Sequence, residues 1–170
     1  MRNLLTALLT AGALLGAAGS ASAGTATTTF TVTATVNTNC KVSTPAAGLT
    51  FNYTPGAGPA TNTTTVTVNC TKGTPFNTEL TAGTTTGSNI AQRLLASGGN
   101  TLQYNLYSDS AWTKVWGVTP GTDAVAGTGG GMAAAAAVTY TVYGQVVDSA
   151  PNQAIPTGTY TDTITVNVAY

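Results

Sequence analysis

The side chains that most often carry out chemistry are scarce in this sequence. Among its 170 residues are no histidine, two cysteines and five acidic residues. Without histidine, neither a Ser-His-Asp nor a Cys-His catalytic arrangement is available. Two carboxylates can hydrolyse a glycosidic bond, but the acids here are scattered singly, and we expect them to be solvated. We therefore predict that the protein is not an enzyme and has no catalytic residue.

Motifs for cofactors and metals are also missing. The glycine-rich stretch GTGGG, residues 127–131, lacks the Lys-Ser/Thr pair that completes a phosphate-binding loop. Asp109, Asp123 and Asp148 do not have the spacing of a calcium loop. A zinc site would need more ligands than the two cysteines supply. We expect no metal and no cofactor.

The beginning of the chain indicates export. A basic start at residues 1–3, an apolar run over residues 4–19 and the small residues 21–23 are typical of a secretory signal peptide cleaved after Ala23. A membrane-spanning helix is the alternative, but the run is shorter than the roughly 20 residues that a bilayer requires. In an oxidising compartment, Cys40 and Cys70 favour a disulfide. Because Cys70 falls on an inward-facing strand position, we expect the bridge to join two strands across the core.

Cleavage would leave about 147 residues, the size of one domain. This part has four basic and five acidic residues, giving a net charge of about −1. Nucleic-acid binding depends on clustered lysine and arginine side chains, so no nucleic-acid partner is expected. Abundant valine, threonine and tyrosine argue against a disordered chain.

The alternation of apolar and polar residues predicts an all-β protein. Short alternating runs occur in LTFNY (49–53), TTTVTVNC (63–70), PFNTEL (75–80), TLQYNLY (101–107) and VTYTVY (138–143), separated by turn residues. The stretch at 84–100 breaks the pattern and is predicted to be a loop or a short helical turn. Trp112 and Trp116 are four residues apart; we favour core packing over a sugar-stacking platform. The pattern as a whole predicts an immunoglobulin-like β-sandwich.

The two ends of the predicted mature chain carry the clearest alternation. At the C-terminal end, one face presents Ile164, Val166, Val168 and Tyr170. Near the N-terminal end, one face of the segment TTTFTVTATV presents Phe30, Val32, Ala34 and Val36. Such an apolar stripe requires a partner sheet, and alternation alone does not say whether that sheet belongs to the same chain.

Several segments together resemble the spore coat protein U domain family, which includes the pilins of archaic chaperone–usher pili. The resemblance covers nearly all of the chain after the signal peptide. The matching segments are Cys40-Lys41-Val42, LTFNY followed by Pro55, VTVNCTKGTPF, Arg93, LQYNLYSDSAWTKVWG, YTVYGQV, Gln153 and PTGTYTDTITVNVAY.

This resemblance implies an immunoglobulin-like fold that lacks one strand, which a neighbouring subunit supplies. Residues 1–23 would be the signal peptide, 24–36 the donor strand and 37–170 the pilin domain. Phe30, Val32, Ala34 and Val36 would enter the groove of the next subunit, although the register could shift by two residues to include Thr28 or omit Val36. Ile164, Val166, Val168 and Tyr170 would flank the groove that accepts the strand.

The resemblance also implies partners and a location. A periplasmic chaperone would fill the groove first, and the exchange for a donor strand would take place at an outer-membrane usher. The product would be an extracellular fibre of identical or homologous subunits that serves surface adhesion and biofilm formation. Three alternatives remain open: a self-completed monomeric sandwich acting as a binding protein, a spore or capsule coat protein, and a tip adhesin, for which we expect an additional domain.

Overall fold

The structure is a computed structural model that describes residues 23–45 and 48–170. It separates into two units, Met1–Thr35 and Val36–Tyr170. In the first unit, residues 23–35 form neither helix nor strand, and all of them are exposed. The predicted signal peptide lies outside the described residues except for its last residue, Ala23. In the described ranges, no helix has the length and apolar character needed to cross a bilayer.

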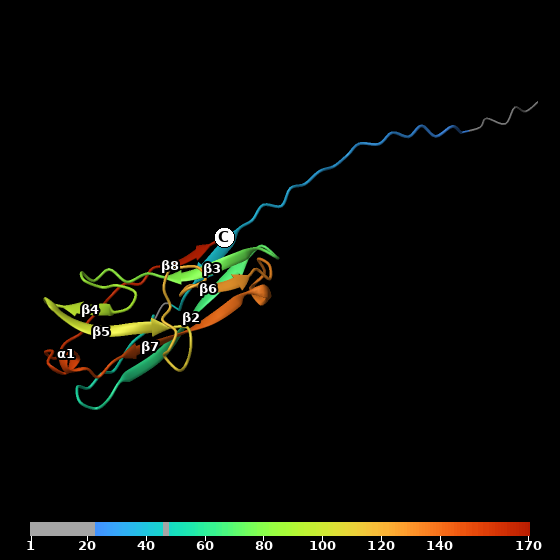
Figure 1. Ribbon diagram of the computed structural model, residues 1–170. Coiled ribbons are helices and arrows are strands. Elements are labelled where there is room, and N and C mark those ends of the chain that lie inside the picture. The colour runs from blue at the N-terminus through green and yellow to red at the C-terminus, as the bar shows by residue number, and fades with distance from the viewer. Residues whose placement is uncertain (1–22, 46–47) are drawn as a thin grey trace, which may run out of the picture. The chain divides into compact units, whose positions relative to one another are not determined.

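Regular structure in the second unit is almost entirely antiparallel β-strand (Figure 1). Four of the five predicted alternating runs form strands, but the run at 49–53 does not, because its backbone has no partner strand. The strands are β1 (Cys40–Ser43), β2 (Ala60–Cys70), β3 (Pro75–Leu80), β4 (Arg93–Ser97), β5 (Asn100–Tyr107), β6 (Val125–Thr128), β7 (Val138–Val146) and β8 (Val166–Ala169). Two short helical turns, η1 (Ala134–Ala136) and α1 (Ala150–Gln153), flank β7.

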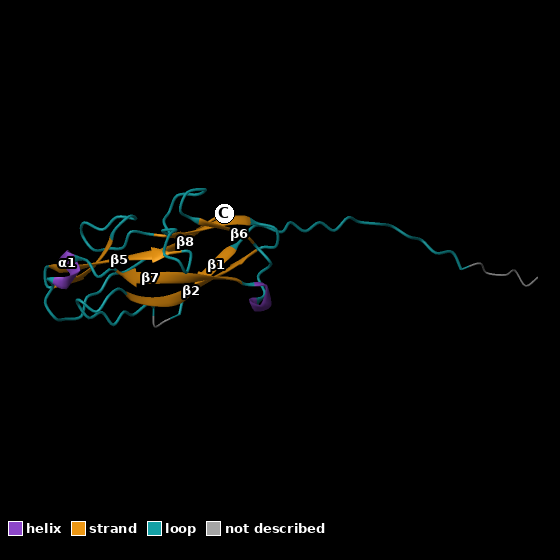
Figure 2. Ribbon diagram, turned by 60° about the horizontal axis from the view of Figure 1, so that its bottom comes forward, coloured by secondary structure: helices purple, strands orange, loops and turns teal. Residues whose placement is uncertain are grey.

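The strands form two sheets that make an immunoglobulin-like β-sandwich. The larger sheet has the order β1-β2-β7-β5-β4, and the smaller sheet has the order β6-β3-β8. Figure 2 shows the strands in two layers. Inward-facing residues of both sheets, joined by Trp116 from the loop between β5 and β6, make the core, as the predicted all-β fold requires. The residues are Val66, Val68, Cys70, Phe76, Leu80, Leu102, Tyr104, Leu106, Trp116, Val142 and Val146.

The disulfide between Cys40 and Cys70 is confirmed, but its predicted position across the core is wrong. The two cysteines are direct register partners in the antiparallel pair of β1 and β2, with their Cα atoms 4.1 Å apart. The bridge therefore links neighbouring strands within one sheet. The edge strand β1 has only four residues, so this covalent link helps to hold it against β2.

A second correction concerns the stretch at 84–100, which was predicted to lack strand structure. It contains β4, which pairs with β5 through a tight hairpin. Gly98 and Gly99 form the two-residue turn with φ values of 52° and 90°. Both values lie in the left-handed region that a type I′ turn requires at its central residues. Core packing is confirmed for Trp116, which is buried, but not for Trp112, which is 36% exposed.

Candidate binding groove

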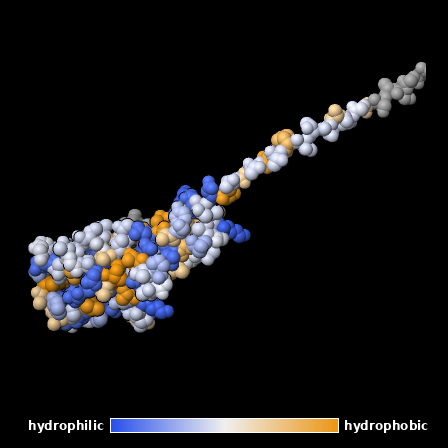
Figure 3. Space-filling view, turned by 45° about the horizontal axis from the view of Figure 1, so that its top comes forward, coloured by the Kyte–Doolittle hydropathy of each residue, from blue (hydrophilic) through white to orange (hydrophobic). Residues whose placement is uncertain are grey.

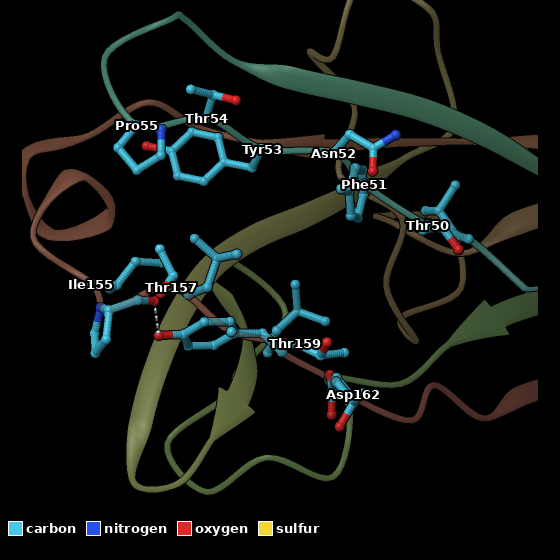
Figure 4. Close-up of a pocket in the computed structure, with 17 residues that line it drawn as sticks. Thr50, Phe51, Asn52, Tyr53, Thr54, Pro55, Ile155, Thr157, Thr159 and Asp162 are labelled. Carbon is cyan, nitrogen blue, oxygen red and sulfur yellow. Dashed lines mark hydrogen bonds between the residues drawn. The ribbon is translucent and has the colours of Figure 1, made fainter.

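A groove of about 800 Å³ opens at the surface of the sandwich between two segments that lie far apart in the sequence. We call residues 49–55 the first wall and residues 155–162 the second wall; Leu95 and Leu102 complete the lining. Figure 4 shows Phe51 and Tyr53 of the first wall across from Ile155 and Thr157 of the second.

The groove continues into a smaller inner cavity of about 200 Å³ between the two sheets. Four residues line both spaces: Leu49, Phe51, Leu95 and Asp162. The rest of the inner cavity is mostly apolar, with Val66, Leu80, Leu106, Val142, Ile164 and Val166 among its lining residues. Hydrophobic residues also form a band on the face of the sandwich shown in Figure 3. The core is therefore open to the surface where the inner cavity meets the groove.

The backbone along the groove is largely unpaired. Among the described residues, those at 49–53 belong to no strand and make no main-chain to main-chain hydrogen bond. Strand β8 pairs with β3 on one edge only, and residues 162–164 precede it without strand structure. Free N–H and C=O groups next to exposed apolar side chains are the features to which an additional β-strand binds.

The carboxylate of Asp148 holds the first wall. It accepts hydrogen bonds from the hydroxyl of Tyr53 at 2.6 Å and from the N–H groups of Gly56 at 3.1 Å and Gly58 at 2.9 Å. These bonds, first of all the one from Tyr53, lower the pKa of Asp148 from 3.8 to about 2. Burial and the bond to Asp148 raise the pKa of Tyr53 to about 12.

Asp162 holds the second wall where the C-terminal segment passes from one sheet to the other. On one side of Asp162, Thr161 forms a β-bridge with Ala96 of β4 in the larger sheet. On the other side, the carbonyl of Thr165 accepts from the N–H of Thr81, which directly follows β3 of the smaller sheet. The Asp162 carboxylate accepts from the hydroxyl of Tyr104 at 2.7 Å. Burial acts to raise the pKa of Asp162, but the bonds from Tyr104 and backbone N–H groups outweigh it, so this pKa lies below its usual value.

A buried arginine ties the two sheets together beneath this crossing. The guanidinium of Arg93 donates to the carbonyl oxygens of Leu80, Thr81 and Trp116 and to the side-chain oxygen of Asn105. Burial lowers the pKa of Arg93, and this loss of hydration is offset by four neutral acceptors. The core below the groove is therefore fixed by directed hydrogen bonds as well as by apolar packing.

The predicted acceptor residues occupy different environments. Ile164 and Val166 line the inner cavity. Val168 is partly buried against the core and pairs with Thr78 of β3. Tyr170 is 62% exposed and does not line either space. The structure thus brings two of the four residues to the inner cavity and none to the outer groove.

The predicted donor residues are on a segment with no helix or strand, residues 23–39. Phe30, Val32 and Val36 are 87%, 80% and 83% exposed, and Ala34 is exposed as well. The donor assignment of these four residues therefore stays a prediction.

Sequence reasoning missed the polar residues that shape the groove. The acids were expected to be solvated, and for Asp148 and Asp162 this is wrong, because each carboxylate accepts several hydrogen bonds. No local pattern marks these two acids, because the groups that donate to them come from distant parts of the chain. In the described ranges, no three His, Cys, Asp or Glu side chains come together in a way that could hold a metal ion.

Comparisons with known proteins agree with this architecture. The family model described as Spore Coat Protein U domain matches residues 26–167. Among solved structures, a chain in the crystal structure of the CsuC–CsuE chaperone–tip adhesion subunit pre-assembly complex, from archaic chaperone–usher Csu pili of Acinetobacter baumannii, is similar with a TM-score of 0.54 and 23% identity. The match covers 80% of the present chain and 40% of the solved one. No curated protein matches the sequence.

Proposed function

Because the chain belongs to the Spore Coat Protein U domain family, we propose that it is a structural subunit of an extracellular pilus. Subunits are joined by donor-strand exchange, in which residues 24–36 of one subunit fill the groove of the next. The observation that carries the proposal is a groove that has unpaired backbone along its walls and opens into an apolar inner cavity, in a chain that also has an alternating apolar segment.

The donor segment matches the groove in its chemistry. Phe30, Val32, Ala34 and Val36 share one face of an extended chain and cover about 20 Å at roughly 3.3 Å per residue. Their backbone would pair with the free edges of the groove, and their side chains would enter the lining around Ile164 and Val166. Burying these four side chains contributes roughly 4 to 8 kcal/mol before ordering costs are subtracted.

Assembly by this exchange gives a fibre. The donor segment and the groove are different surfaces of the subunit, so the contact is heterologous. Repeating such a contact from subunit to subunit builds an open filament unless the rotation happens to close a ring. Before assembly, an empty groove exposes apolar core and sheet edges, which favour aggregation. We therefore infer a periplasmic chaperone that occupies the groove first, an outer-membrane usher where the exchange occurs, and an extracellular location of the product. Such a fibre would serve surface adhesion and biofilm formation, without catalysis.

A denaturing gel of the exported protein tests the proposal. The protein is co-expressed with its neighbouring secretion genes and loaded either unheated or boiled. Strand exchange predicts a ladder of multimers that collapses on boiling to one band of about 15 kDa, the mass of about 147 residues. Deleting residues 24–36 should remove the ladder.

The competing function is a self-completed monomeric β-sandwich that acts as a secreted binding or coat protein. It predicts a single monomer band in both lanes, and that result would contradict the pilus proposal.

A further inference from the structure

We propose that Asp148 is a positioning residue that keeps the first wall of the groove in the conformation that receives a strand. This inference rests on the proposed function and goes beyond it by assigning control of groove geometry to one carboxylate. It follows from how few hydrogen bonds hold the first wall in place.

The first wall packs against the core through Leu49, Phe51 and Tyr53, but it makes few hydrogen bonds to the sandwich. Its residues 49–53 make no main-chain to main-chain hydrogen bond with the described part of the chain. Near its beginning, the side chain of Asn62 donates to the carbonyl of Thr50 at 2.7 Å. Leu49 and Phe51 pack over Gly144, where a Cβ atom would lie 2.4 Å from Leu49 Cδ2. Hydrogen bonding at its far end depends on Asp148.

Asp148 uses both carboxylate oxygens on this one segment. Oδ1 accepts from Tyr53 Oη and from the N–H of Gly56, and Oδ2 accepts from the N–H of Gly58. Gly56 and Gly58 have φ values of 78° and 97°, so the loop that presents their N–H groups is a specific left-handed turn. Both ends of the turn are bonded to the same carboxylate, which fixes where the first wall ends.

The same residue lies on the connection to the second wall. Asp148 follows β7 and precedes α1, after which the chain continues into residues 155–162. The helical turn is itself anchored, because the buried side chain of Asn152 bonds to both the N–H and the C=O of Gln103 in β5. Asp148 therefore fixes the first wall to a part of the chain that leads directly into the second wall, and so sets the spacing between them.

A first wall that is already in place binds an incoming strand more tightly than one that must first be ordered. An incoming strand gains main-chain hydrogen bonds only where the first wall already presents its N–H and C=O groups in an extended form. If the wall is loose, ordering several of its residues costs conformational entropy, and this cost reduces affinity. We therefore expect loss of the carboxylate to weaken strand binding more than it weakens the fold.

Two measurements test the inference on the exported full chain; every form compared below, including the wild-type reference, carries Val32→Asp so that its own donor segment does not fill a groove. A synthetic peptide with the sequence of residues 24–38 is labelled, and its affinity for wild type, Asp148→Ala and Tyr53→Phe is measured by fluorescence anisotropy. Hydrogen–deuterium exchange reports opening of residues 49–58. The matched control is Asp109→Ala, which removes a carboxylate that accepts from Thr113 and Lys114 in a loop outside the groove.

The expected result is about tenfold weaker peptide binding for Asp148→Ala, with faster exchange confined to residues 49–58, a smaller effect for Tyr53→Phe and none for Asp109→Ala. Unchanged peptide affinity in Asp148→Ala would overturn the inference, whether or not exchange became faster. The hydrogen bonds of Asp148 would then support the fold without affecting strand binding. If wild type itself did not bind the peptide, the proposed function would be contradicted together with the inference.

Discussion

The guanidinium of Arg93 donates a 2.7 Å hydrogen bond to the main-chain carbonyl of Trp116, and both residues are fully buried. The same guanidinium reaches the carbonyls of Leu80 and Thr81, so one cation connects the end of β3 in the smaller sheet with β4 in the larger. None of these acceptors is a carboxylate. The arrangement depends on the fork of nitrogen donors that arginine alone provides.

Replacing this arginine should destabilise the fold severely. Arg93→Met removes the side-chain donor to three carbonyls and one of the two donors to the Asn105 side-chain oxygen. We expect the free energy of unfolding to fall by at least about 3 kcal/mol. Urea unfolding followed by tyrosine and tryptophan fluorescence measures this change. Arg93→Lys should also be destabilising, because a lysine cannot reach the same set of acceptors. Lys72→Met, at an exposed position, is the control, and a similar small loss in all three variants would contradict the role of Arg93.

Removing the disulfide should lower the free energy of unfolding, because the bond ties the edge strand β1 to β2. Cys40 and Cys70 enclose a loop of 30 residues, so replacing both with alanine is expected to lower the free energy of unfolding by roughly 3.5 kcal/mol on the chain-entropy model. Urea unfolding measures the loss. Wild type in reducing buffer should match the double variant, and a loss below about 1 kcal/mol would show that β1 is held by pairing and packing alone.

A matched pair of charge substitutions tests the donor face. Val32→Asp puts an unpaired carboxylate on the face that would be buried in the neighbour, which is strongly unfavourable. Thr33→Asp puts the same charge on the opposite face. We expect Val32→Asp to abolish the ladder of multimers on an unheated gel while export continues, and Thr33→Asp to retain it. Fibres of normal length with Val32→Asp would show that the donor face has been assigned incorrectly.

Lowering the pH should reveal how much the Asp148 carboxylate contributes to the free energy of unfolding. Its pKa is lowered to about 2 in the folded protein, so folding favours the ionised form. Its stabilising effect is present above the pKa of the unfolded chain, about 4, and is lost as the pH falls through about 2. The difference in urea midpoint between wild type and Asp148→Asn should therefore be largest near neutral pH and shrink in acid. A difference that did not change with pH would mean that the carboxylate's charge contributes nothing to stability.

Sequence patterns predicted the strands well because burial in a sandwich repeats every second residue. The alternation in residues 63–70 and 75–80 reappears as buried Val66, Val68, Phe76 and Leu80. The disulfide partners were also identifiable, since the chain has only two cysteines. That they lie in neighbouring strands depends on strand order, which alternation does not encode.

The polar framework of the groove could not be predicted in the same way. Arg93 and Asp148 bond mainly to backbone groups, and every residue type has those groups. Their partners come from distant parts of the chain, so no local spacing reveals them. The first wall shows a related limit: Leu49, Phe51 and Tyr53 do share an inward face, but the backbone between them lacks the partner strand that would make it a β-strand.

The position of the disulfide also determines how the subunit responds to mechanical force. A pull on residues 24–36 travels along the backbone and reaches Cys40, the first residue of β1. There the covalent bond to Cys70 passes the load directly to β2, which pairs with β7 along nine register positions. The four-residue edge strand is therefore protected from being peeled away one hydrogen bond at a time, and tension enters the molecule through its longest strand.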